Sequence, residues 1–184
     1  MKLRHAKLID FTGSVKEFSA FSKFDQSVID HLRDKGKAEV AIIVDRAYEI
    51  DGGFAHKDAP FLVSDHLNLT GSNPLVGPNN PIGERFPVVN NIYLGAADTM
   101  DQEETWTLGN PLGKMSSGIA CGVKSGLSAG PSEQMTMKNL GADFYCFNLV
   151  PSMIVAAHAG LKVIGLGIKD GQTLAPDVIA CLLR

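Results

Sequence analysis

The sequence predicts an α/β fold in which helices cover a central, largely parallel or mixed β-sheet on both faces. Short apolar, β-branched segments alternate along the chain with segments of helical spacing. The 184 residues are 45% hydrophobic, which is enough apolar material for one sizeable core. No repeat, low-complexity tract or Ser/Gly linker interrupts the chain. We therefore expect residues 1–184 to form a single domain.

The first expected elements are a helix and two strands. Residues 25–34 have apolar side chains near helical spacing, and Lys35-Gly36-Lys37 is typical of a helix end. Residues 39–44 are apolar and β-branched, which indicates a buried strand, and residues 61–63 indicate a second one. Asn, Pro and Gly are so frequent in residues 68–92 that we expect a long loop there. Its apolar residues should anchor it to the molecule: Phe86, Val88, Val89, Ile92 and Tyr93.

The second half of the chain continues the alternation. The expected elements are a strand at 117–123, a helix at 133–139, a strand at 144–147, a helix at 152–158, a strand at 162–168 and a helix at 178–183. Pro151 suits the first turn of the helix that follows it, and Gly160 suits its end. In sheets of this kind, ligands usually bind at the carboxyl ends of the strands.

Composition excludes several classes of partner. Lys and Arg total 17 against 20 acidic residues, so the net charge of -3 provides no field that would attract nucleic acid or anionic lipid. The three cysteines, Cys121, Cys146 and Cys181, show no C-x-x-C spacing, and no His, Cys or carboxylate cluster has metal-ligand spacing. There is no apolar leader and no run of about 18 apolar residues. These features favour a cytoplasmic protein with reduced thiols and a small-molecule or protein partner.

Three stretches resemble the trimeric purine nucleoside phosphorylase family. The first is Ser64 to Asn79 (SDHLNLTGSNPLVGPN) with residues 83–87 (GERFP). The second is residues 129–132 (AGPS) with residues 140–143 (LGAD), and the third lies within residues 150–163. The resemblance covers about residues 38–171, and residues 1–35 form a shortened, divergent N-terminal part.

The resemblance implies a fold and a reaction. Members of that family fold around a mixed, partly barrel-like sheet, form trimers and cleave purine nucleosides with phosphate to give the base and a sugar 1-phosphate. They need no metal or organic cofactor, because inorganic phosphate is the co-substrate. Such a site must hold an anion against the sugar and stabilise negative charge on the departing purine.

The resemblance suggests three phosphate-binding residues. The family's N-terminal Gly-Ser-Gly and Arg-x-His motifs have no clear counterpart, and Ser14 in Thr12-Gly13-Ser14 is the nearest candidate, although a plain turn is the better interpretation. Gly52 belongs to a Gly-Gly pair like the family's, but it follows Glu49 and Asp51, which would repel an anion. Asn148 stands where the family has a phosphate-contacting serine. It could donate to phosphate or cap the following helix.

The base-binding candidates are Glu133, Gln134, Phe147 and Asp170. The family's Gly-Pro-Ser-Phe-Glu motif supplies an aromatic wall and a carboxylate, whereas this chain has Glu133 and Gln134 after Ser132. Glu133 could bond a purine N–H or simply serve as a first-turn glutamate. Phe147 could form a wall of the nucleoside site. Asp170 could accept from a ring N–H or belong to an ordinary Asp-Gly turn.

Phe86 aligns with a family phenylalanine that reaches into the neighbouring subunit's sugar pocket, which implies a homotrimer. The alternative is an aromatic ring that anchors the loop on its own core. Asp65 and His66 are adjacent, so on a strand they should point to opposite faces and form no catalytic dyad. His158 should have a structural role at a helix end.

The sequence thus favours a purine nucleoside phosphorylase-type glycosyltransferase. Because the N-terminal phosphate motifs are missing, weak activity or none is also consistent with the residues. The first alternative is a degenerate homologue that binds a nucleoside or base, or serves as a structural partner, without turnover. The second is a related nucleosidase or methylthioadenosine phosphorylase.

Overall fold

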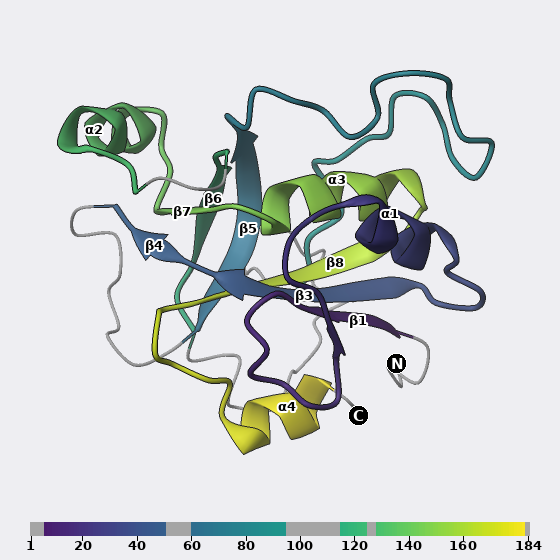
Figure 1. Cartoon of the computed structure of the whole chain (residues 1–184), viewed down its shortest axis with the longest axis horizontal. Coiled ribbons are helices and arrows are strands. Elements are labelled where there is room, and N and C mark those ends of the chain that lie inside the picture. The colour runs from purple at the N-terminus through teal and green to yellow at the C-terminus, as the bar shows by residue number, and fades with distance from the viewer. Residues whose placement is uncertain (1–5, 51–59, 95–114, 125–127, 183–184) are drawn as a thin grey trace.

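The computed structural model describes residues 6–50, 60–94, 115–124 and 128–182 (Figure 1). Its strands are β1 (Ala6–Asp10), β2 (Ser19–Ala20), β3 (Val40–Arg46), β4 (Tyr48–Glu49), β5 (Phe61–Asn68), β6 (Ser117–Gly122), β7 (Phe144–Cys146) and β8 (Lys162–Ile168). Its helices are α1 (Gln26–Arg33), α2 (Pro131–Asn139), α3 (Leu149–His158) and α4 (Pro176–Leu182). The predicted α/β class, with a central mixed sheet flanked by helices, is confirmed.

The strands form one sheet in the order β2-β1-β3-β8-β5-β6-β7-β4. The central pair, β3 and β8, is parallel and in register from Val40↔Lys162 to Arg46↔Ile168. The β5–β8 and β4–β7 pairs are antiparallel, which makes the sheet mixed. Parallel neighbours bring their carboxyl ends to one edge, so the residues that follow β1, β3 and β8 lie at the same edge of the sheet.

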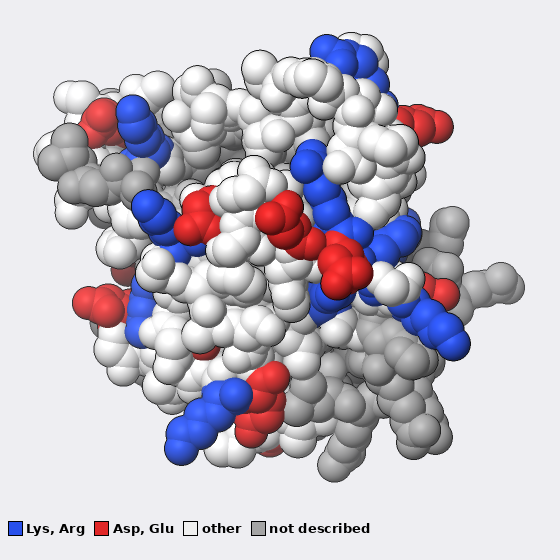
Figure 2. Space-filling view, turned by 45° about the vertical axis from the view of Figure 1, so that its right-hand side comes forward, with Lys and Arg blue, Asp and Glu red and all other residues white. Residues whose placement is uncertain are grey.

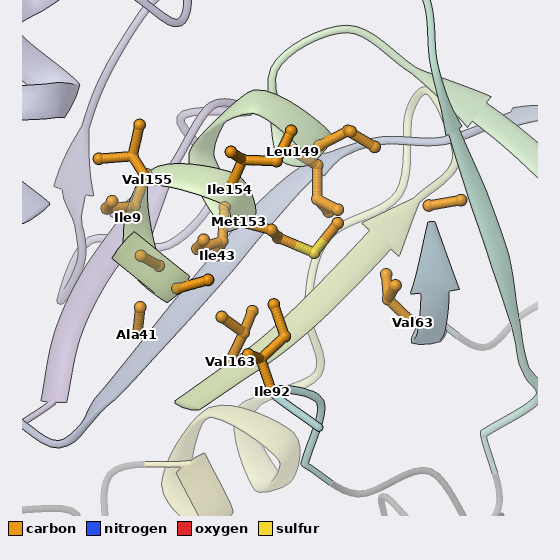
Figure 3. Packing of buried hydrophobic residues seen from close by; sticks show 14 of the residues in the cluster. Ile9, Ala41, Ile43, Val63, Ile92, Leu149, Met153, Ile154, Val155 and Val163 are labelled. Carbon is orange, nitrogen blue, oxygen red and sulfur yellow. The ribbon is translucent and has the colours of Figure 1, made fainter. Parts of the chain in front are cut away.

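Helices cover both faces of the sheet. α1 and α3 lie on one face and α4 lies on the other (Figure 1). All ten residues of α3 are buried, and its apolar side chains pack against β1, β3, β5 and β8 (Figure 3). α3 is therefore a core helix rather than an amphipathic surface helix, because it is apolar on every side.

Local sequence explains where the helices begin and end. Asp25 caps α1 by accepting a hydrogen bond from the Ser27 N–H at 2.9 Å, and Gly36 follows the helix with a φ of 54°. α3 begins at Leu149, three residues before the predicted start at 152, so Pro151 lies in its first turn as expected. Gly160 ends α3 with a φ of 74°.

The segment after β5 is irregular, as predicted, but two of its expected anchors are wrong. Ile92 and Tyr93 are buried, whereas the Phe86 side chain is 82% exposed and Val88 is 70% exposed. Val89 packs against the core as predicted, and Leu75 and Ile82 do so as well. The segment is held at the end of α3, where an ideal Cβ on Gly83 would lie 1.8 Å from the His158 carbonyl oxygen. Only glycine fits so close an approach.

The described surface mixes both signs of charge. Lys and Arg alternate with Asp and Glu over the face shown in Figure 2. Within the described ranges, no helix has the length and apolar character needed to cross a bilayer. Cys121 and Cys146 are buried free thiols, and burial raises the pKa of Cys121 to about 11. These two side chains fit the prediction of reduced, buried cysteines.

Candidate functional site

The candidate site lies where β3, β7 and β8 end. Phe147 and Asn148 connect β7 to α3, Tyr48 follows β3, and Lys169 and Asp170 follow β8. β4 pairs with β7 so that Tyr48 lies opposite Tyr145. The antiparallel β4–β7 pair thus brings the end of β7 to the end of β3, and with it the predicted site residues Phe147 and Asn148 together with an aromatic residue from a separate strand.

Three aromatic rings form a cluster in this site. The rings of Tyr48 and Tyr145 are stacked, with centroids 5.1 Å apart and an interplanar angle of 18°. Phe147 tilts against Tyr48 at a centroid distance of 5.0 Å. Burial, followed by the Asp45 charge, raises the pKa of Tyr48, so its hydroxyl is neutral at physiological pH. Such a cluster offers an apolar, flat surface to a planar ligand.

The sequence analysis identified Phe147 but missed both tyrosines. The sequence predicts the strand that contains Tyr145. The place of Tyr145 in an aromatic cluster, however, depends on the pairing of β7 with β4, which the sequence does not indicate. Tyr48 lies on the two-residue strand β4, which is too short for a periodicity signal. The signal that was available is the aromatic spacing of Tyr145 and Phe147, which places both rings on one face.

Asn148 is tied to a buried carboxylate at the start of α3. Its backbone N–H donates to Asp45 Oδ2 at 2.8 Å, and its side-chain Nδ2 donates to Asp45 Oδ1 at 3.1 Å. The Asn148 Oδ1 in turn accepts from the Phe24 N–H at 2.8 Å. Asn148 occupies the N-cap position of α3, as the capping interpretation predicts, but its side chain makes no cap hydrogen bond. Asp45 caps the helix in its place, because its Oδ2 also accepts from the Leu149 N–H at 3.0 Å.

Asp45 is a further residue of this site that the sequence does not indicate. Its side chain is 2% exposed, and no cation among the described residues forms an ion pair with it. Burial raises the pKa of Asp45, and the hydrogen bonds from Asn148 oppose that shift. The helix N-terminus supplies the partial positive charge that offsets this carboxylate.

Glu133 and Gln134 lie in the first turn of α2. Glu133 Oε2 accepts from the Gly130 N–H at 2.8 Å, which is half of a capping box, and Gln134 Nε2 donates to the Ala129 carbonyl at 2.8 Å. The Ala129 N–H donates to the Tyr145 hydroxyl at 3.3 Å. This last contact connects the start of α2 to the aromatic cluster.

Charged side chains at the end of β8 are paired with one another. Arg46 donates to the carbonyls of Lys169 and Gln172 at 2.8 and 2.9 Å. The Arg46 Nε lies 3.9 Å from the carboxylate of Asp170, whose side chain is 92% exposed, and Lys169 Nζ lies 3.4 Å from Glu49. The structure therefore places Asp170 at the solvent side of the site.

Ser14 belongs to a turn organised by a second buried aspartate. Asp10 accepts from the Thr12 N–H at 2.7 Å and from the Val15 N–H at 2.8 Å, and Thr12 Oγ1 lies 2.6 Å from Ser14 Oγ. The turn follows β1 at the same edge as the end of β3. Gly52 and Asp51 lie outside the described residues.

Phe86 lies apart from the aromatic cluster, in a groove of about 500 Å³ on the irregular segment. The groove is also lined by His66, Asn68, Arg85 and Ile154. Because Phe86 is exposed, it does not anchor the loop on its own core. Figure 1 shows this segment and α2 at different ends of the molecule.

The neighbouring histidines have structural contacts. His66 Nδ1 is hydrogen-bonded to the Tyr93 hydroxyl and lies 4.0 Å from the exposed Asp65 carboxylate. Burial lowers the pKa of His66, and the Asp65 charge opposes that shift. His158 Nε2 contacts Asn79 Oδ1 at 3.1 Å, which ties the irregular segment to α3. Within the described residues no group of three His, Cys, Asp or Glu side chains could hold a metal ion.

The fold is thus a mixed α/β sheet flanked by helices, with an aromatic cluster and an amide side chain where β3 and β7 end. No family model matches the chain. Purine nucleoside phosphorylase 1 of Bacillus subtilis is 30% identical over 129 residues, which are 70% of this chain and 46% of the relative. The purine nucleoside phosphorylase of Mus musculus is 32% identical over 148 residues, which cover 74% of this chain and 48% of the relative.

Solved structures share the fold. A Schistosoma purine nucleoside phosphorylase in complex with hypoxanthine has a TM-score of 0.62 and 20% identity, over 84% of this chain and 59% of that one. The Schistosoma mansoni enzyme in complex with inosine also has a TM-score of 0.62, at 21% identity over 84% of this chain and 58% of that one. The chain belongs to the purine nucleoside phosphorylase family. It spans about half the length of the curated relatives it matches.

Proposed function

We propose that the chain is a purine nucleoside phosphorylase-type glycosyltransferase, which converts a purine nucleoside and phosphate to the purine base and a sugar 1-phosphate. The observation that carries the proposal is the aromatic cluster of Tyr48, Tyr145 and Phe147 beside the Asn148 amide, in a chain related to such enzymes. A planar ring and a polar edge are the two features that a purine site needs.

The proposed roles follow from the positions of the side chains. The base lies against Phe147, and Asp170 or the first turn of α2, with Glu133 and Gln134, contacts its edge. Asp170 is close enough for its charge to affect Tyr48, which supports its place beside the rings. Phosphate lies toward Asn148, with Ser14 on the same sheet edge and Gly52 as the third contact. No metal or organic cofactor takes part.

The same proposal includes a homotrimer. Phe86 on the irregular segment is 82% exposed, and Val76, which lines the same groove, is 83% exposed. An exposed cluster of this kind is typical of a surface that another subunit covers. The neighbouring subunit would receive Phe86 at its sugar site, as in the family that the sequence resembles.

A second candidate function is nucleoside or base binding without turnover. The observation that favours it is that the polar groups of the site already form hydrogen bonds within the chain. Asp45 accepts the N–H groups of Asn148 and Leu149, and Glu133 and Gln134 both bond to backbone beside α2. A ligand would have to compete with each of these contacts.

Base release from nucleosides tests the two candidates. The purified chain is incubated with inosine, guanosine or adenosine, with and without phosphate, and free base is measured by chromatography. Release only with phosphate supports the glycosyltransferase. Binding of hypoxanthine by calorimetry with no release supports the second candidate, and release without phosphate would show a nucleosidase instead. If the chain neither binds hypoxanthine nor releases free base, both proposals are contradicted.

A further inference from the structure

The strongest anion-binding position of the site is already occupied by the chain itself. The N-terminus of a buried helix normally offers free N–H groups to a phosphate. At the start of α3 the first two N–H groups, those of Asn148 and Leu149, both donate to Asp45 Oδ2, at 2.8 and 3.0 Å. A third donor, Asn148 Nδ2, donates to Asp45 Oδ1 at 3.1 Å. The side chain of Asp45 thus makes the contacts that two phosphate oxygens would make.

The position of Asp45 is fixed by the fold rather than by a chance rotamer. It lies on the central strand β3, directly before the last residue, Arg46, and its Oδ1 also accepts from the Arg46 N–H at 2.9 Å. With 2% of its surface exposed, it cannot swing into solvent without breaking these hydrogen bonds.

The cations near the site do not offset this carboxylate. Arg46 donates to two backbone carbonyls and faces Asp170, and Lys169 faces Glu49. A phosphate that approached Asn148 would therefore meet the buried negative charge of Asp45. The N–H donors that could bind the phosphate already donate to that carboxylate. Two like charges a few ångströms apart repel strongly where water is excluded.

We propose that Asp45 is a specificity-determining residue that competes with phosphate for the N-terminus of α3 and thereby weakens phosphate binding without weakening nucleoside binding. This inference rests on the proposed function, because it assigns the phosphate subsite to the Asn148 side of the cleft. The inference explains why the chain has an aromatic cluster that could bind a nucleoside, while the N–H groups that could bind phosphate donate to Asp45 instead.

The test is a titration of inorganic phosphate into the wild-type chain and two variants, followed by calorimetry. Asp45→Asn removes the charge, and Asp45→Ser removes the charge and also frees the N–H groups of Asn148 and Leu149. We expect the phosphate Kd to fall at least about tenfold in Asp45→Asn and further in Asp45→Ser. Hypoxanthine binding without phosphate should change by less than about threefold.

The matched control is Asp143→Asn. Asp143 also accepts a strand N–H, that of Ile119 at 2.8 Å, but it precedes β7 and so lies away from α3's first turn. Its variant should bind phosphate as the wild type does. Circular dichroism checks that each variant is folded.

Equal phosphate Kd values in the wild type and both Asp45 variants, whether tight or undetectable, would overturn the inference. If neither variant folds, the wild type alone decides, because a submillimolar phosphate Kd would overturn the inference and no binding at tens of millimolar would support it. Failure of the proposed function appears separately, as loss of hypoxanthine binding in every protein.

Discussion

At the scale of single residues, the polar side chains of the site form their hydrogen bonds with other groups of the same chain. Asn148 uses its N–H, its amide nitrogen and its amide oxygen on Asp45 and Phe24. Phe86 is the contrasting case, because its ring is exposed and its neighbour Arg85 lies over it at 5.8 Å. The contacts of Asn148 therefore stabilise the fold of the chain itself, whereas the exposed ring of Phe86 is available to contact another molecule.

Phe86 provides a prediction about assembly. If its ring is buried against a second copy, Phe86→Ser should weaken association by the loss of apolar burial, about 1.5–3 kcal/mol per ring or roughly a tenfold to hundredfold change in the dissociation constant. Sedimentation velocity over a range of concentrations measures it. Met135→Ser is the control, because Met135 is also exposed, at 65%, but lies on α2. A monomeric wild type, or equal effects of both substitutions, would contradict the trimer.

At the scale of elements, α3 determines where the site is placed. Its N-terminus carries Asn148 and its C-terminal end contacts the irregular segment through His158. The helix can pack this deeply because the strands below it present glycines. An ideal Cβ on Gly122 of β6 would lie 2.6 Å from the Val150 Cβ, and one on Gly165 of β8 would lie 3.2 Å from the Met153 sulfur.

Gly122→Ala tests this packing. The added methyl group cannot fit without moving Val150, which is fully buried in the first turn of α3, so we expect a loss of about 1–3 kcal/mol in the free energy of unfolding. Urea denaturation followed by circular dichroism measures it. Gly130→Ala is the matched control, because the nearest atom to its Cβ would be the end of the Glu133 side chain at 3.8 Å. Equal stability of the two variants would show that α3 can shift.

Most elements could be predicted from the sequence because their signals are local. Apolar β-branched runs gave β3 and β8, and helical spacing gave α1. β1 was missed because Ala6–Asp10 is short and includes a lysine, and its strand conformation comes from pairing with β3. Asp45 was missed for a similar reason. Its role depends on residues 103 and 104 positions later in the chain, and no local pattern reports such a contact.

At the scale of the whole molecule, partly and fully buried imidazoles couple stability to pH. His31, His66 and His158 come from α1, β5 and α3, and burial lowers the pKa of each. A lowered pKa means that the unfolded chain binds protons more readily than the folded chain. These three groups therefore contribute stability above the ordinary histidine pKa of about 6.5, and that contribution is lost as the pH falls through their folded pKa values. Asp45 acts in the opposite sense, because its pKa is raised.

His158→Gln separates one histidine from the others. Glutamine cannot become charged and can still reach Asn79, so the fall in Tm between about pH 7.5 and pH 5.5 should be smaller in this variant than in the wild type. Differential scanning calorimetry at both pH values measures the two differences. Identical pH slopes would mean that His158 is protonated without cost in the folded chain.

Because every residue of α3 is buried and both of its ends are tied to distant segments, the helix has no position that is free to vary. In a saturation mutagenesis survey, substitutions along Leu149–His158 should register as low abundance of the protein rather than as an altered catalytic rate. Positions that affect ligand binding at normal abundance should then be sought at the partly exposed Tyr48 and Phe147 and at the exposed Asp170, where a side chain can change without opening the core.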